Sequence, residues 1–346
     1  MRILVIGGTS FIGRFLLERL MRERHQIAVF HRGRHSSEKP SGIEQIVGDR
    51  NHLRECHHAF ERLVPDIVID MILSSGRQAK ELMATFAGLT GRVVALSSMD
   101  VYRACAVMHG LEPGPIEPVP LTEDSPLRTK GQTYPPAQIK MLQQIFGWLD
   151  DEYDKIPVER EVLGHPTLPG TVLRLPMVYG PGDPLNRLLP VLKRIDDGRR
   201  TILFSESMAK WRGPRGYVEN VAAAVALAAT SARAAGRIYN VAEPQTITEL
   251  DWARKIASVA GWDGKFMVVP DECAPAHLRP PGNAEQHWVA DSTRIRQELE
   301  YHEPIEQDVA ISRTLEWMRA NPARNTSPHV FDYAAEDATI TSTVHK

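Results

Sequence analysis

The sequence ILVIGGTSFIG, which runs from Ile3 to Gly13, decides the fold of this chain. Its first four residues are uncharged β-formers, as a strand buried in a parallel sheet requires. Apolar residues from Phe11 onward recur at helical spacing, so a glycine-rich turn joins this strand to a helix. The free N–H groups and the positive dipole end of such a helix attract a pyrophosphate. The stretch therefore predicts a dinucleotide-binding site of the Rossmann type.

The residues of this turn have separable roles. Gly7 makes the tight turn, and Gly13 lets the helix pack close to the strand. Ser10 takes the place of the middle glycine of the usual pattern, and its hydroxyl can bond a phosphate oxygen. A tight connection between strand and helix without any ligand is the alternative. We expect the cofactor to contact Gly7, Thr9, Ser10, Phe11, Ile12 and Gly13.

Short apolar strands alternate with helical stretches, which predicts an α/β fold with a Rossmann-type, doubly wound parallel sheet. The expected strands are residues 3–6, 27–30, 44–47, 67–70, 93–97 and 171–175, with helices at 51–63 and 77–88 among those between them.

We expect the dinucleotide-binding domain at residues 1–175, with the chain returning to it at 217–242 through a strand at 238–241. A smaller substrate-binding part then comprises residues 176–216 and 243–320, including a helix at 248–260. The proline-dense stretch 112–136 predicts a long irregular insertion. Residues 322–346 predict a tail that lies on the surface or is disordered.

Composition limits the partners. A net charge of −2 predicts no nucleic-acid or membrane footprint. Three scattered cysteines favour a reduced, cytoplasmic setting, and no apolar run reaches the length of a membrane span. The adjacent His57 and His58 would point apart on a helix, so no metal site is expected.

Charged residues after the second and third strands bear on the choice of cofactor. His31-Arg32-Gly33 ends the second strand, where an NAD site usually has an acid for the ribose 2′-hydroxyl. Arg32 can instead bind a 2′-phosphate, so we favour NADP over NAD, with a solvent-facing arginine as the alternative. Asp49, followed by Arg50, could accept from the adenine amino group or merely close a turn. The expected contacts here are His31, Arg32, Asp49 and Arg50.

Serines end the fifth strand, in the sequence LSSMDVY at residues 96–102. Ligands of open α/β sheets bind beyond the carboxyl ends of the strands. We expect Ser97 to contact the cofactor and Ser98 to bond a substrate oxygen. Either serine could instead cap a turn.

Six motifs in family order now identify a resemblance: IGGTSFIG, LSSMDVY, PLTEDSPLR, LRLPMVYGPGD, RGYVENVA and IYNVAEPQTIT. Over residues 1 to about 320 the chain resembles the extended short-chain dehydrogenase/reductase superfamily, in its NAD-dependent epimerase/dehydratase branch. The resemblance implies a nicotinamide cofactor and a nucleotide-sugar substrate, and it allows a homodimer.

The resemblance also implies a catalytic serine or threonine with a Y-x-x-x-K pair. Ser98 matches the serine, and Lys155 matches the lysine that holds the nicotinamide ribose. The tyrosine position four residues earlier is Asp151, so the chain resembles the atypical members of the superfamily. We expect Tyr153 to stand in as the acid/base if the helix begins after it. Asp151 is the rival, and Tyr102 and Tyr134 are further candidates.

Three residues of the C-terminal part match positions that bind substrate in the family. Arg215 corresponds to an arginine on a substrate phosphate, and Asn186 and Arg187 would line the same cleft. The main hypothesis is a nucleotide-sugar oxidoreductase. A dinucleotide-binding protein without turnover is the alternative, because the tyrosine position is empty. An RNA-associated protein, as reported for atypical chloroplast relatives, is less favoured on charge.

Overall fold

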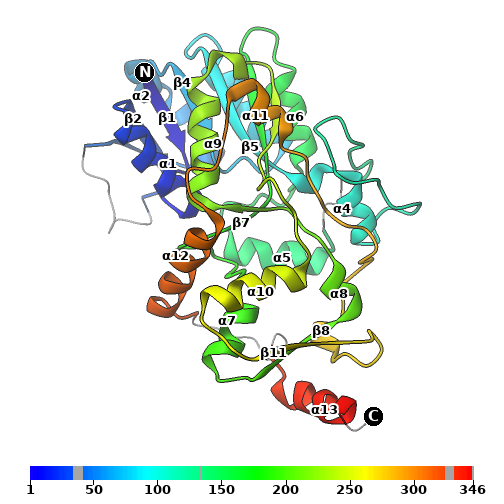
Figure 1. Ribbon diagram of the computed structural model, residues 1–346. Helices are drawn as coiled ribbons and strands as arrows, with labels where there is room; N and C mark the ends of the chain where they lie inside the picture. The colour runs from blue at the N-terminus through cyan, green and yellow to red at the C-terminus, as the bar shows by residue number, and fades with distance from the viewer. Residues whose placement is uncertain (34–41, 132–133, 324–330, 345–346) are drawn as a thin grey trace.

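The central element is a sheet of seven parallel strands in the order β10-β6-β5-β4-β1-β2-β3 (Figure 1). The computed structural model describes residues 1–33, 42–131, 134–323 and 331–344. The strands are β1 (Arg2–Ile6), β2 (Gln26–His31), β3 (Glu44–Val47), β4 (Ile67–Asp70), β5 (Arg92–Ser98), β6 (Gly170–Leu175) and β10 (Ile238–Asn240). All six expected strands are confirmed, and β10 pairs in parallel with β6, so the chain does return to the sheet. The fold class is therefore confirmed.

Helices cover both faces of this sheet, because apolar side chains of β1 point alternately to the two faces and are buried on both. Ile3 and Val5 pack with α1 (Phe11–Arg22) and α9 (Val218–Thr230), while Leu4 and Ile6 face the opposite core. That second core lies under α3 (Gly76–Phe86) and α6 (Lys155–Leu163). In the sheet, β1 lies between β2 and β4. The chain passes from β1 to β2 and β3 on one side of β1 and then returns to form β4 on the other side. This reversal of strand order opens a crevice at the carboxyl ends of the strands.

The expected helix at 51–63 is broken in two. Arg50–Cys56 forms a 3-10 turn in which His52 has a non-helical φ of −138°, and α2 (His57–Leu63) follows. Further along, α4 (Arg103–Met108) precedes the proline-dense stretch. The described residues of that stretch are irregular, as expected, until α5 (Pro136–Ile145) begins.

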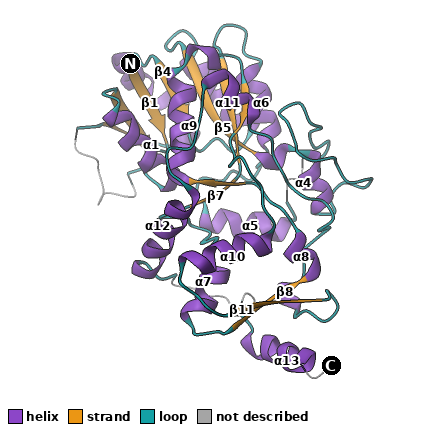
Figure 2. Cartoon of the chain, in the orientation of Figure 1, coloured by secondary structure: helices purple, strands orange, loops and turns teal. Residues whose placement is uncertain are grey.

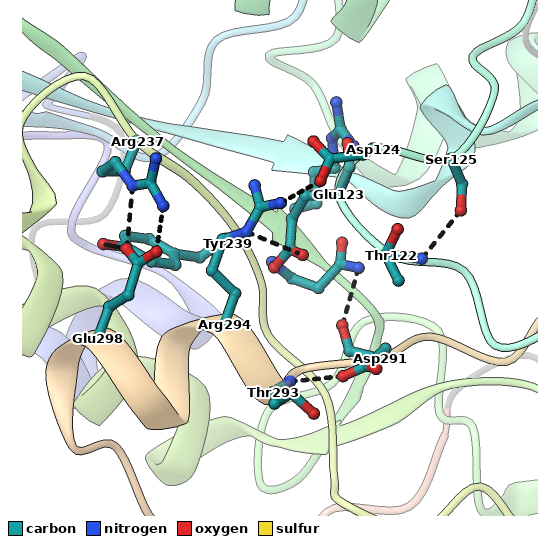
Figure 3. Close-up of polar contacts among 12 residues, drawn as sticks. Thr122, Glu123, Asp124, Ser125, Arg237, Tyr239, Asp291, Thr293, Arg294 and Glu298 are labelled. Carbon is teal, nitrogen blue, oxygen red and sulfur yellow. Dashed lines mark hydrogen bonds and ion pairs between the residues drawn. The ribbon is translucent and has the colours of Figure 1, made fainter.

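The irregular stretch is fastened to the edge of the sheet (Figure 3). Glu123 accepts from the backbone N–H of Asn240 at 2.8 Å and pairs with Arg294 at 3.4 Å. Arg294 belongs to α11 (Thr293–Leu299), and Arg237 and Tyr239 both bond Glu298 of the same helix. The PLTEDSPLR motif is therefore held by β10 and α11, which come far later in the sequence.

The remaining elements gather below the sheet in Figures 1 and 2. Two small parallel pairs, β7 (Met177–Tyr179) with β9 (Arg215–Tyr217) and β8 (Thr201–Ser205) with β11 (Lys265–Val269), lie among the helices. The expected helix at 248–260 is confirmed as α10, with Thr248 as its N-cap. The helices here are α7 (Leu189–Asp196), α8 (Glu206–Lys210), α10 (Glu249–Val259) and α12 (Gln307–Ala320).

The C-terminal stretch, expected as a tail that lies on the surface or is disordered, contains a helix. Its described residues form α13 (Tyr333–Val344), whose Glu336 is completely buried. Glu336 forms a bidentate pair with the buried Arg194 of α7 and accepts from His277 at 3.0 Å. The charge pair anchors a helix that its weak apolar pattern did not reveal. No helix within the described residues is long and apolar enough to span a membrane.

Candidate active site

The glycine-rich turn has the geometry that a bound pyrophosphate needs. Gly7 has a φ of +80° and donates its N–H to the Phe30 carbonyl at 3.0 Å. A Cβ on Gly13 would lie 2.5 Å from the Gly8 carbonyl oxygen, so only glycine lets α1 start this close to β1. Ser10 is the extended N-cap residue of α1, and its hydroxyl makes no cap hydrogen bond among the described residues. The helix start therefore presents N–H groups and a hydroxyl to solvent.

A hollow beside this turn brings together six of the predicted cofactor residues. Trp148, from the loop before α6, also lines it. Phe11, Ile12 and Gly13 lie next to the hollow in the first turn of α1. The lining residues are Gly7, Thr9, Ser10, Phe30, His31, Arg32, Gly33, Gly48, Arg50, Ile72 and Trp148.

The residues after β2 have different roles. His31 is buried, donates from Nε2 to Gln45 at 2.7 Å, and accepts the Gly33 N–H at Nδ1 at 3.0 Å. Its ring thus shapes the turn. Arg32 is exposed at the mouth of the hollow and donates to the Gly147 carbonyl at 3.1 Å. Arg32 is free to exchange this carbonyl for a phosphate.

Asp49 and Arg50 are held by local contacts. Asp49 accepts the Asn51 N–H at 2.8 Å and caps the 3-10 turn. This contact corresponds to the alternative prediction, in which Asp49 merely closes a turn. Arg50 is buried and pairs with Asp70 at 2.9 Å. Burial raises the pKa of Asp70, and the Arg50 guanidinium opposes that shift. Arg50 Nε and Nη1 are buried and have no hydrogen-bond partner among the described residues.

Lys155, the residue expected to hold the nicotinamide ribose, lies at the start of α6. It is the first residue of α6, with Asp154 as N-cap, and its side chain is buried. Its ammonium donates to the Leu73 carbonyl and to the Leu96 carbonyl, the latter at 3.0 Å, near the carboxyl ends of β4 and β5. Burial lowers the pKa of Lys155 to about 8.

Tyr153 turns inward, as expected for a residue outside the helix. Its ring centroid lies 5.9 Å from the Lys155 ammonium. Its hydroxyl donates to Asp100 Oδ2 at 2.7 Å, and Tyr134 donates to the same oxygen at 3.1 Å. Burial and the neighbouring Asp100 carboxylate raise the pKa of Tyr153 well above its usual value.

The other candidates for the acid/base are engaged elsewhere. Asp151 is exposed and accepts from Gln143 at 2.8 Å. Tyr102 is fully buried and donates to Asn240 at 2.6 Å. Of the candidates, Tyr153 and Tyr134 both reach Asp100, and Tyr153 lies beside Lys155.

The two serines at the end of β5 separate. Ser97 is buried and donates to Glu159 at 2.6 Å, and Glu159 holds Arg174 through two bonds. This network supersedes the expected cofactor contact of Ser97, because its hydroxyl faces α6. Ser98 is partly exposed, and its oxygen accepts the Asp100 N–H at 3.2 Å as the cap of the following turn. The hydroxyl proton of Ser98 remains able to bond a substrate oxygen.

Two of the three predicted substrate residues line one hollow in the expected substrate-binding part, residues 176–216 and 243–320. Arg215 contacts Glu249 and lies over the Trp252 ring at 4.6 Å, and Arg187 donates to Asp183 at 2.8 Å. Asn186 precedes Arg187 in a left-handed conformation with a φ of +47° and is not among the lining residues. The lining residues are Met177, Tyr179, Arg187, Leu188, Arg215, Glu249 and Trp252.

Sequence reasoning missed three side chains of the site. Asp100 stands inside the quoted LSSMDVY motif, and an acid two residues after Ser98 is the signal that could have revealed it. Arg128, from the irregular stretch, donates to the Asp100 carbonyl and to Asp154, both at 2.7 Å. Trp148 has no local signal.

Comparisons with known proteins agree with this fold. A model of the NAD dependent epimerase/dehydratase family matches residues 3–242. A 2'-dehydrokanamycin reductase from Streptomyces kanamyceticus is 25% identical over 85% of this chain and 75% of its own length. Chloroplast stem-loop binding protein of 41 kDa b from Arabidopsis thaliana is 28% identical, over 38% of this chain and 39% of its own length.

Solved structures share the architecture at low identity. A dTDP-glucose 4,6-dehydratase from Bacillus anthracis, in complex with NAD, matches with a TM-score of 0.65 and 14% identity over 93% of this chain and 97% of that one. A UDP-glucose 4-epimerase from Thermotoga maritima, with UDP-glucose, matches with a TM-score of 0.64 and 17% identity. The latter match covers 93% of this chain and 100% of the other.

Proposed function

Because the chain belongs to the NAD dependent epimerase/dehydratase family, we propose that it is a nicotinamide-dependent oxidoreductase that acts on a nucleotide sugar. One observation carries this proposal. The Lys155 ammonium bonds the Leu73 and Leu96 carbonyls near the carboxyl ends of β4 and β5, and the Tyr153 ring centroid lies 5.9 Å from it. An acid/base group and a ribose-holding cation are what hydride transfer demands of a protein.

The residues present fit a nicotinamide dinucleotide. Gly7 and Gly13 carry no side chain, so a pyrophosphate can approach the backbone closely at the turn. The start of α1 presents N–H groups and the Ser10 hydroxyl to that pyrophosphate. Lys155 would hold the nicotinamide ribose. The cofactor, when bound, would supply or accept a hydride at the substrate carbon. The protein would position that carbon and move a proton at the substrate oxygen through Tyr153, with Ser98 bonding the same oxygen.

The hollow lined by Arg187 and Arg215 supports a substrate that carries a diphosphate. Guanidinium groups match phosphate oxygens in geometry and charge, and both arginines line this hollow. The epimerase that shares this fold was solved with UDP-glucose. We therefore propose that the substrate is a nucleotide sugar and that the enzyme is cytoplasmic.

The test is a direct one on purified protein. Calorimetric titration with NADP, NADPH, NAD and NADH should show micromolar binding of at least one of them. Absorbance at 340 nm should then change when UDP- or dTDP-linked sugars are added. Protein that binds none of the four dinucleotides would overturn the proposal.

Arg32 is proposed to select NADP. In Arg32→Asp the carboxylate repels a 2′-phosphate and accepts from a free 2′-hydroxyl, so NADP affinity falls relative to NAD. A charge-assisted contact of this kind contributes roughly 1.5–3 kcal/mol, or about tenfold to a hundredfold in affinity. Arg62→Asp, an exposed position on α2, serves as the control for the change in net charge. An unchanged NADP/NAD ratio in Arg32→Asp would show that Arg32 serves only the Gly147 carbonyl.

Tyr153 is proposed as the acid/base, against Asp151. Tyr153→Phe should reduce turnover of whichever nucleotide sugar reacts by about 10²–10⁴-fold, the usual contribution of a positioned proton donor. Asp151→Asn should keep its activity, because Asp151 is exposed and faces Gln143. Loss of activity only in the asparagine variant would exclude Tyr153. Full activity in both variants would refute the proposed set of Ser98, Tyr153 and Lys155.

An RNA-associated role is the second candidate, since the chain is similar over 38% of its length to a stem-loop binding protein. The charge of −2 and the pairing of many exposed arginines with carboxylates oppose it. A gel shift with a stem-loop RNA that weakens as salt rises would support this role.

A further inference from the structure

Asp100 is a buried carboxylate that the expected catalytic set does not include. It lies in the turn Met99–Val101, directly after β5, and its side chain is completely buried. Its Oδ2 accepts from Tyr153 at 2.7 Å and from Tyr134 at 3.1 Å. Its Oδ1 has no partner among the described residues. A fully buried carboxylate that serves two phenols with one oxygen is costly to keep without a purpose.

The direction of the Tyr153 hydrogen bond decides what the pair can do. The phenol proton points to Asp100, so the lone pairs of the Tyr153 oxygen remain for another donor. A substrate hydroxyl that donates to this oxygen would form a chain from substrate through Tyr153 to Asp100. The carboxylate is then the group that finally holds the proton.

The surroundings suit a carboxylate that exchanges a proton. Burial raises the pKa of Asp100, which brings it closer to neutral pH, while the two phenols, Arg128 and Lys155 keep its charged form available. The groups that act on the Asp100–Tyr153 pair are Cys105, His109, Arg128, Tyr134 and Lys155. Tyr134 and Tyr153 both line an open hollow of about 560 Å³, which gives the pair a route to solvent.

We propose that Asp100 is the proton acceptor behind Tyr153, a positioning residue through which the substrate proton leaves the site. This proposal rests on the proposed function. When an alcohol is oxidised, its O–H proton goes to the Tyr153 oxygen as the Tyr153 proton goes to Asp100 Oδ2. A bound oxidised nicotinamide would accept the hydride from the same carbon. In the reverse direction the protonated Asp100 returns its proton through Tyr153, so the balance is kept.

The experiment reads the phenol itself and needs no substrate. Protein labelled with [¹³Cζ]tyrosine is titrated by NMR, and the Tyr153 signal is assigned from its absence in Tyr153→Phe. In wild-type protein Tyr153 should stay protonated above pH about 10. In Asp100→Asn its pKa should fall by about one unit or more, because the carboxylate that opposes a phenolate is gone while Lys155 remains. Tyr134→Phe is the matched control, since it removes a phenol and keeps the carboxylate.

Each outcome decides the proposal. A Tyr153 pKa below 10 in the wild-type protein, or the same pKa in Asp100→Asn, would overturn it. If Asp100→Asn does not fold, a Tyr153 pKa below 10 in the wild-type protein still overturns the proposal. Where a nucleotide sugar turns over, the acid limb of the pH profile should disappear in Asp100→Asn, and its persistence would also overturn the proposal. If no sugar reacts, the proposed function fails, while the titration still tests Asp100.

Discussion

Gly13→Val is expected to abolish dinucleotide binding. A Cβ at this position would lie 2.5 Å from the Gly8 carbonyl oxygen and 2.6 Å from two further backbone atoms of Gly8. Backbone cannot rotate away as a side chain can, so α1 must move off the turn. The N–H groups at the start of α1 would then no longer face the pyrophosphate. We expect at least a hundredfold loss of NADP affinity by calorimetry, with a destabilisation of about 1–3 kcal/mol from overpacking.

The matched control places the same side chain elsewhere on the same helix. Glu18→Val lies on the exposed face of α1, so it adds a β-branched residue without a clash. It should bind cofactor as the wild-type protein does. Undiminished NADP affinity in a folded Gly13→Val protein would refute the assignment of the turn.

The parallel sheet could be predicted from sequence because its signals are local. Buried parallel strands are short, uncharged runs, and each of the six expected runs is a strand of the sheet. The order of the strands depends on which strands pair with each other, and this order places the crevice between β1 and β4. The helix α13 could not be predicted, because the bidentate pair of Glu336 with Arg194 joins residues far apart in the sequence.

The candidate site was accessible from sequence only in part. Tyr153 was expected to turn inward because Lys155 begins the helix, and the structure bears out that geometry. The partner of its hydroxyl is Asp100, which is 53 residues away along the chain. Ser97 shows the reverse case, since its place at the end of β5 predicted a ligand and its contact is Glu159 on α6. The position of a residue along a strand can be predicted from the local sequence, whereas the partner of its side chain depends on tertiary packing.

Lys155→Met should remove turnover and lower cofactor affinity by about tenfold to a hundredfold, as expected for the loss of one charge-assisted contact. The variant also leaves the Leu73 and Leu96 carbonyls without their donor, so its melting temperature must be measured beside its affinity. Lys80→Met, at an exposed position on α3, is the control and should behave as wild type.

The pH dependence separates a ribose-holding ammonium from a merely structural lysine. Burial lowers the pKa of Lys155 to about 8, so its ammonium is present below that pH and is lost above it. Wild-type cofactor affinity should therefore fall as pH rises through about 8, and Lys155→Met should show no such fall. The stability of the wild-type protein should change in the opposite sense. Between pH about 8 and about 10.4 the unfolded chain binds more protons at this lysine, so unfolding becomes less favourable as pH rises, relative to Lys155→Met. A difference between the two proteins in stability but not in the pH dependence of affinity would leave Lys155 a structural residue.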